Sequence, residues 1–94
     1  LVMYTLVIYD ISDDEIRFKV ANACKSVGLS RIQKSAFLGV IDSQTRKSLR
    51  RRLERILGDS SGNIQIFLIC ENDMRFRDII GKIYKEGDED IMVI

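Results

Sequence analysis

Hydrophobic and polar positions change period several times along the chain, and each change marks the boundary of a predicted element. Residues Met3 to Asp10 alternate within a β-branched and aromatic composition, which is typical of a buried strand. Ser12-Asp13-Asp14-Glu15 then matches a helix capping box, and Gly28 supplies a left-handed stop. Between them an apolar stripe recurs at helical spacing: Ile16, Val20, Ala23, Cys24 and Val27. The first third of the chain therefore predicts a strand and a core-facing helix.

The middle of the chain predicts a strand, a helix and a strand. Residues Arg31 to Ile41 follow a period of two, so we expect one strand there, with one face made of Arg31, Gln33, Ser35, Phe37 and Gly39. Asp42 or Ser43 can cap a second helix that runs to Leu57, with the buried stripe Leu49, Leu53, Ile56 and Leu57. Residues Asn63 to Glu71 are almost continuously apolar, which predicts a central strand covered on both faces.

The end of the chain predicts shorter elements. These are a helix capped by Asn72-Asp73 that reaches about Ile80, a strand near Lys82–Lys85, an acidic loop Glu86–Asp90 and an apolar segment Ile91–Ile94. The whole order predicts a single domain over residues 1–94. Its class is α/β (α+β): a ferredoxin-like βαββαβ sandwich, with an antiparallel sheet, helices on one face and a short C-terminal strand.

The sheet face opposite the helices has no predicted cover from its own chain. On the predicted register it carries Phe37, Phe67 and Ile69 among the polar residues Gln33, Ser35 and Gln65. Because an apolar patch of this kind usually marks an interface, we expect a homodimer built sheet to sheet.

Composition limits the chemistry. The 94 residues include no histidine, which excludes serine or cysteine catalysis that uses histidine, and also histidine zinc sites. The two cysteines, Cys24 and Cys70, lie within apolar patterns, and we interpret them as buried thiols of a reducing compartment. No signal peptide or membrane span is indicated near the N-terminus, so we expect a cytoplasmic protein.

Charge is unevenly distributed although the formal net charge is only +1. Glu86–Asp90 is strongly acidic, whereas the second helix carries an arc of basic residues beside its apolar stripe, with Arg52 on the far side: Arg46, Lys47, Arg50, Arg51 and Arg55. Two interpretations are open: a solvated basic face, or a track that contacts the phosphates of duplex DNA without reading bases.

Asp10 is the candidate metal ligand. It ends the first strand just before a helix, where it is either a turn former or an oxygen ligand for Mg²⁺ or Mn²⁺ that activates water for phosphodiester hydrolysis. A single carboxylate provides too few ligands to hold a metal ion, so a twofold axis that brings two copies of Asp10 together would supply a second one. Asp13 and Asp14 are alternative ligands, although both also suit a helix N-terminus.

Two further side chains have two interpretations each. Phe37 is either part of a dimer core or a stacking platform for a base, and we favour the dimer core. Arg17 either pairs with an acid or meets a phosphate, and we favour the ion pair.

Three segments resemble the second CRISPR-associated core protein family in order and spacing. They are Tyr4 to Ile11 with its Tyr9-Asp10 end, Asp13-Asp14 followed by Arg17, and Arg31 to Gly39. The resemblance implies a homodimer of CRISPR adaptation that bridges two dimers of the partner integrase and holds protospacer duplex DNA. It also implies a metal-dependent endonuclease of single-stranded RNA or duplex DNA in some members, with Asp10 at the position of the Mg²⁺ ligand.

The same resemblance assigns Tyr9, Arg17, Arg31 and Phe37 to the region of that site, and joins the last strand, here Ile91–Ile94, to the sheet of the other subunit. Two alternatives on the same fold are an RNA-recognition-type binding module and a ligand-sensing regulatory domain. The first lacks its basic-Gly-aromatic strand motif in residues 63–71, and the second lacks a Gly-rich ligand loop. The adaptation protein is therefore our leading hypothesis.

Overall fold

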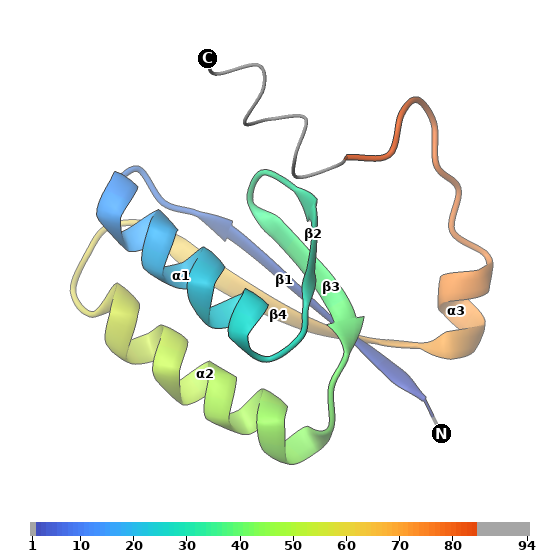
Figure 1. The fold of residues 1–94 in the computed structure, drawn as a ribbon, viewed down its shortest axis with the longest axis horizontal. Helices are drawn as coiled ribbons and strands as arrows, with labels where there is room; N and C mark the ends of the chain where they lie inside the picture. The colour runs from blue at the N-terminus through green and yellow to red at the C-terminus, as the bar shows by residue number, and fades with distance from the viewer. Residues whose placement is uncertain (1, 85–94) are drawn as a thin grey trace.

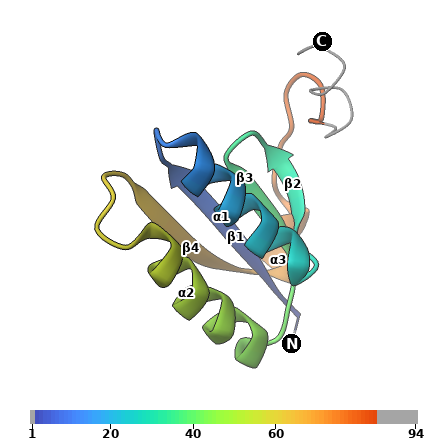
Figure 2. The ribbon, with the colours of Figure 1, turned by 60° about the vertical axis from the view of Figure 1, so that its left-hand side comes forward.

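The computed structural model describes residues 2–84. In chain order the elements are β1 (Met3–Asp10), α1 (Asp14–Ser26), β2 (Ser30–Gln33), β3 (Ala36–Val40), α2 (Ser43–Leu57), β4 (Asn63–Cys70) and α3 (Glu71–Arg75). The four strands form one sheet in the order β2-β3-β1-β4, and every neighbouring pair is antiparallel. α1 and α2 lie side by side on the same face of this sheet (Figures 1 and 2). The predicted ferredoxin-like βαββαβ sandwich is confirmed.

The segment predicted as one strand, Arg31 to Ile41, is a hairpin. Lys34 and Ser35 form a turn, so that Arg31 lies opposite Phe37 and Gln33 lies opposite Ala36, with an irregularity between Arg31 and Gln33. Phe37 pairs with Val7 of β1 and is fully buried beneath the helices. Its predicted place on the uncovered face is therefore wrong, because a period-two count does not show which face of the sheet the helices cover.

β4 lies at an edge of the sheet within residues 2–84, and β1 is a central strand. The prediction of a central strand at residues 63–71 is therefore wrong. Phe67 and Leu68 remain 43% and 47% exposed. A continuous apolar run here reflects apolar surface left uncovered at an edge, which composition alone does not distinguish from burial on both faces.

The helix ends also differ in detail from the prediction. Asp13, not Ser12, caps α1, and its carboxylate accepts a hydrogen bond from the Ile16 N–H at 3.0 Å. Asp42 caps α2 in the same way through the Thr45 N–H at 2.7 Å. α3 ends at Arg75 rather than near Ile80, and residues 82–84 form no strand. The predicted elements at residues 85–94 lie outside the described residues.

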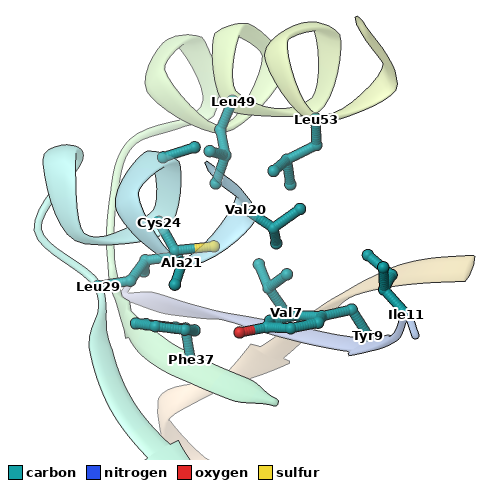
Figure 3. Packing of buried hydrophobic residues seen from close by; sticks show 11 residues of the cluster. Val7, Tyr9, Ile11, Val20, Ala21, Cys24, Leu29, Phe37, Leu49 and Leu53 are labelled. Atoms are coloured by element: carbon teal, nitrogen blue, oxygen red, sulfur yellow. The ribbon is translucent and has the colours of Figure 1, made fainter. Parts of the chain in front are cut away.

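The core lies between the sheet and the two long helices (Figure 3). Val7 contributes from β1, Val20 and Cys24 from α1, and Leu49 and Leu53 from α2; all are less than 3% exposed, so both predicted helix stripes are confirmed. Burial raises the pKa of the Cys24 thiol to about 12, which keeps it protonated and unreactive. Cys70 is half-buried, and both thiols are free.

The other sheet face carries the side chains that alternate with this core. Tyr4, Leu6 and Ile8 of β1 lie opposite Ile69, Phe67 and Gln65 of β4, respectively, and opposite Val40, Leu38 and Ala36 of β3. We call these nine residues the open face. Neither α1 nor α2 covers it (Figure 2). Gln65, Phe67 and Ile69 therefore lie on this face as predicted, whereas Phe37 is buried beneath the helices and Ser35 lies in the hairpin turn. Within residues 2–84, none of the helices has the length and apolar character needed to cross a membrane.

Candidate functional site

Asp10 is the last residue of β1, and its side chain is exposed. It lies opposite Asn63, the first residue of β4. Because Tyr9 points into the core and side chains alternate along a strand, Asp10 belongs to the same side of the sheet as the open face. A carboxylate and an amide are thus neighbours at the end of this face.

Gly62 holds the turn before β4 against the end of β1. Its φ of +112° lies in the left-handed region, and a Cβ at this position would come within 2.5 Å of the Asp10 carbonyl oxygen. Only glycine satisfies both conditions without a shift of backbone. The backbone position of Asp10 therefore depends on a residue that sequence reasoning did not single out beyond its place in a turn.

The helix-covered side of the sheet holds a second group of predicted site residues. The rings of Tyr9 and Phe37 stack with centroids 6.4 Å apart, and the Arg31 guanidinium lies 5.0 Å from the centroid of Phe37. The Tyr9 hydroxyl donates a hydrogen bond to the Lys34 carbonyl at 3.3 Å. Burial raises the pKa of Tyr9, and the nearby Arg31 only partly opposes this, so the phenol is neutral near pH 7.

Arg17 reaches this group from α1. It forms an ion pair with Asp14, as favoured from the sequence, and with Tyr9 and Arg31 it lines a pocket of about 530 Å³. The structure therefore brings Tyr9, Arg17, Arg31 and Phe37 together but leaves Asp10 on the opposite side of the sheet. The alternative ligands are engaged elsewhere, since Asp13 caps α1 and Asp14 pairs with Arg17.

The donors near Asp10 suit a hard cation in type but not in number. Carboxylate and amide oxygens, as on Asp10 and Asn63, are the ligands that Mg²⁺ and Mn²⁺ prefer. Within residues 2–84 there is no group of three or more His, Cys, Asp or Glu side chains able to hold a metal ion. An ion at Asp10 would therefore need ligands from water, substrate or a second chain.

The basic arc of α2 is only partly available. Lys47, Arg51 and Arg55 are exposed, whereas Arg46 is half-buried. Arg50 is exposed but pairs with Glu54 at 2.8 Å. Arg52, which lies outside this arc, is exposed and donates a hydrogen bond to the Ser26 hydroxyl of α1 at 3.0 Å. We call Lys47, Arg51 and Arg55 the α2 basic surface.

Sequence reasoning assigned no site role to six of the residues that line the pocket: Phe18, Ala21, Asn22, Lys25, Lys34 and Ser35. On α1, Phe18, Asn22 and Lys25 follow one another at spacings of four and three residues, so they share one helix face. That spacing was visible in the sequence, but the turn that brings Lys34 to the same place was not.

Comparison with known proteins agrees with this fold. Residues 3–77 match the family model described as CRISPR associated protein Cas2. The chain is 46% identical over 77 residues to the CRISPR-associated endoribonuclease Cas2 of Korarchaeum cryptofilum, covering 82% of this chain and 83% of that one. It is 39% identical over 67 residues to a CRISPR-associated endonuclease Cas1/endonuclease Cas2 fusion of Thermoproteus tenax, covering 71% of this chain and 25% of the fusion.

Solved structures share this fold. A hypothetical protein of Thermus thermophilus superposes with a TM-score of 0.75 at 30% identity, covering 90% of this chain and 98% of that one. Streptococcus pyogenes Cas2 superposes with a TM-score of 0.72 over 83% of this chain and 99% of that one; its identity of 24% supports the fold alone. With the family model spanning most of the described residues, the chain belongs to the CRISPR-associated protein Cas2 family.

Proposed function

We propose that this chain acts in CRISPR adaptation as a homodimer that bridges two dimers of the partner integrase and holds protospacer duplex DNA. The observation that carries the proposal is the open face, where Val40 and Phe67 are 55% and 43% exposed. Pairing two copies through this face removes apolar surface from water and leaves both helix layers outside. The Thermoproteus tenax fusion, which joins Cas1 and Cas2 names in one chain, supports the integrase as partner.

Duplex binding follows from the same arrangement. The α2 basic surface lies on the outer layer of such a dimer, so each copy offers a row of cations to a phosphate backbone. Contacts of this kind position a duplex without reading its sequence, as an adaptor that accepts many protospacers requires.

Endonuclease activity is the second part of the proposal, and it depends on Asp10. Asp10 lies on the side of the sheet that faces the partner copy, so a twofold axis near the end of β1 would bring two carboxylates and two Asn63 amides together. A bound Mg²⁺ or Mn²⁺ ion would supply an activated water and stabilise negative charge on the phosphodiester. Asp10 would hold the ion, and Gly62 would keep the Asp10 backbone in place.

The experiment separates assembly, binding and cleavage. Light scattering should give a dimer for the wild type and a monomer for Phe67→Asp, because a buried unpaired charge disrupts an apolar interface.

Replacing Lys47, Arg51 and Arg55 by Gln should weaken duplex binding and reduce its dependence on salt concentration. The matched control, which combines Lys19→Gln, Arg75→Gln and Lys82→Gln, removes the same charge elsewhere and should have a smaller effect on both. Asp10→Asn should abolish Mg²⁺-dependent cleavage of RNA or duplex DNA while leaving the dimer intact. A wild-type monomer, or an unchanged salt slope in the α2 triple variant, would overturn the adaptor.

A further inference from the structure

Two amide side chains, Asn63 and Gln65, stand near the start of β4 beside Asp10. Ile64 and Ile66, which alternate with them, pack against the core, so both amides lie on the opposite side of the sheet, the side that carries Asp10. Asn63 is directly opposite Asp10 across the strand pair, and Gln65 lies one step further from the end of the sheet. All three residues are exposed, so their polar groups are open to a ligand.

A hydrogen bond between the two amides decides which way the Asn63 group faces. The Gln65 Nε2 donates to the Asn63 Oδ1 at 3.4 Å. A primary amide is planar and carries its oxygen and its nitrogen on opposite sides. An oxygen turned toward Gln65 therefore turns the Asn63 nitrogen away from it, toward the end of the sheet where Asp10 lies. Asn63 thus presents two N–H donors beside Asp10, while its oxygen is engaged by Gln65.

N–H donors in this place select an anionic oxygen as their ligand. The nitrogen of a neutral amide has no available lone pair, so it does not ligate a cation. Hydrogen bonds to an ionised oxygen are stronger than those between neutral groups. Within residues 2–84 the Asn63 nitrogen donates to no acceptor, so its N–H groups are available to a substrate.

We propose that Asn63 donates a hydrogen bond to a non-bridging oxygen of the phosphodiester at the Asp10 site, and that Gln65 is the positioning residue that holds the Asn63 amide in this orientation. A phosphodiester has two non-bridging oxygens, so one can meet a cation held by Asp10 while the other accepts from Asn63. Negative charge on these oxygens changes as water attacks phosphorus, and a donor fixed beforehand stabilises that transition state. The inference rests on the proposed endonuclease site and adds to it a residue that contacts the substrate.

The first test compares cleavage with metal affinity. Asn63→Ala should lower kcat for Mn²⁺-dependent cleavage about 10- to 100-fold, as expected for one donor to a charged oxygen, and change KM much less. Its affinity for Mn²⁺, measured by calorimetry without nucleic acid, should equal that of the wild type, because the amide is not a ligand. Asn72→Ala is the matched control: Asn72 accepts a hydrogen bond from Arg75 at 2.9 Å in α3, at the other end of β4, and its loss should change neither value.

Gln65→Glu tests the orientation of the amide. A carboxylate accepts hydrogen bonds but does not donate them, so it should draw the Asn63 N–H groups toward position 65 and turn the Asn63 oxygen toward Asp10. The value of kcat should then fall nearly as far as in Asn63→Ala. Combining the two changes should cost no more than Asn63→Ala alone, because both remove the same donor. Light scattering checks that each variant keeps the oligomeric state of the wild type. Losses that multiply in the double variant would overturn the positioning role of Gln65.

A spectroscopic test does not depend on turnover. The side-chain N–H signals of Asn63 in a ¹H–¹⁵N correlation spectrum are identified by their loss in Asn63→Ala. They should move downfield when Mg²⁺ is added together with RNA or duplex DNA whose phosphorothioate linkages slow hydrolysis. The same addition should leave them in place in Gln65→Glu, where the N–H groups face position 65. Signals that do not move in the wild type would overturn the contact.

These outcomes separate the inference from the proposed function. If the wild type does not cleave, or Asp10→Asn cleaves equally well, the endonuclease proposal fails and the Asn63 contact fails with it. If cleavage depends on Asp10 but Asn63→Ala keeps the wild-type kcat, only the Asn63 assignment fails. If Asn63→Ala instead loses affinity for Mn²⁺, Asn63 is a metal ligand through its oxygen, and the assigned orientation is wrong.

Discussion

Gly62→Ala is the most direct test of how the end of β1 is held. The added Cβ would lie 2.5 Å from the Asp10 carbonyl oxygen and 3.3 Å from the Ile11 Cα, so backbone must move on one side of the contact. Gly28→Ala is the matched control, because Gly28 also has a positive φ, +94°, but its Cβ would meet nothing within 4 Å. The two variants share the backbone strain and differ in the steric clash.

The magnitudes follow from that difference. Strain from a non-glycine residue at positive φ costs about 1–2 kcal/mol in both variants. Forcing atoms into a filled space adds about 1–3 kcal/mol, and only Gly62→Ala has this second cost. We therefore expect losses of about 1–2 kcal/mol for Gly28→Ala and about 2–5 kcal/mol for Gly62→Ala.

Urea unfolding followed by far-ultraviolet circular dichroism measures both losses. Wild type and variants must be compared at one protein concentration, because dimerisation would add to apparent stability. Equal free energies of unfolding for Gly28→Ala and Gly62→Ala would refute the close approach of the turn to Asp10. If Gly62→Ala loses the expected stability but keeps Asp10-dependent cleavage, the contact between the Gly62 turn and Asp10 stabilises the fold without positioning the carboxylate.

Three further predictions concern the core, a thiol and a helix cap. Phe37→Ala should lower stability by about 3–5 kcal/mol, since the ring is fully buried, and a thermal melt showing a loss below about 1 kcal/mol would contradict its core role. Cys24 has its pKa raised from 9.0 to about 12 by burial, so the folded state holds this proton more tightly than the unfolded state. The free energy of unfolding should therefore keep this contribution below pH 9.0 and lose it as the pH rises from there toward about 12. Cys24→Ala should show a smaller fall over this range. Identical pH profiles for the wild type and Cys24→Ala in urea unfolding would exclude a contribution of the Cys24 thiol. The Asp42 pKa is lowered from 3.8 by hydrogen bonds from Thr45, so this cap stabilises the fold above pH 3.8 and loses its effect as the pH falls through the lowered value. Asp42→Ala should therefore be less stable than the wild type at neutral pH but not in strong acid, with Asp42→Asn close to the wild type, and a pH-independent difference would contradict the capping role.

The elements with strong local signals were predictable. The bounds of β1 and the buried stripes of α1 and α2 follow from periodicity, because side chains of one element meet the core at fixed spacing. The turn at Lys34 and Ser35 was not predicted, since two strands joined by a short polar turn preserve an apparent period of two. The edge position of β4 was also missed, because strand order depends on contacts with residues far along the chain.

The candidate site was likewise predictable only in part. Similarity to the family drew attention to Tyr9, Asp10, Arg17, Arg31 and Phe37 as a single region. The structure separates Asp10 from the others by the thickness of the sheet, because neighbouring residues on a strand point to opposite faces.

By itself, the amino-acid sequence determined the helix and strand periodicity, the family membership through residues 3–77, and the exclusion of histidine chemistry. Only the tertiary structure decided that Phe37 is buried, that Asp10 neighbours Asn63, and that Phe18 and Lys34 line one pocket. The reason is physical: periodicity arises from bonds between close neighbours in the chain, whereas these placements arise from how distant segments pack against one another.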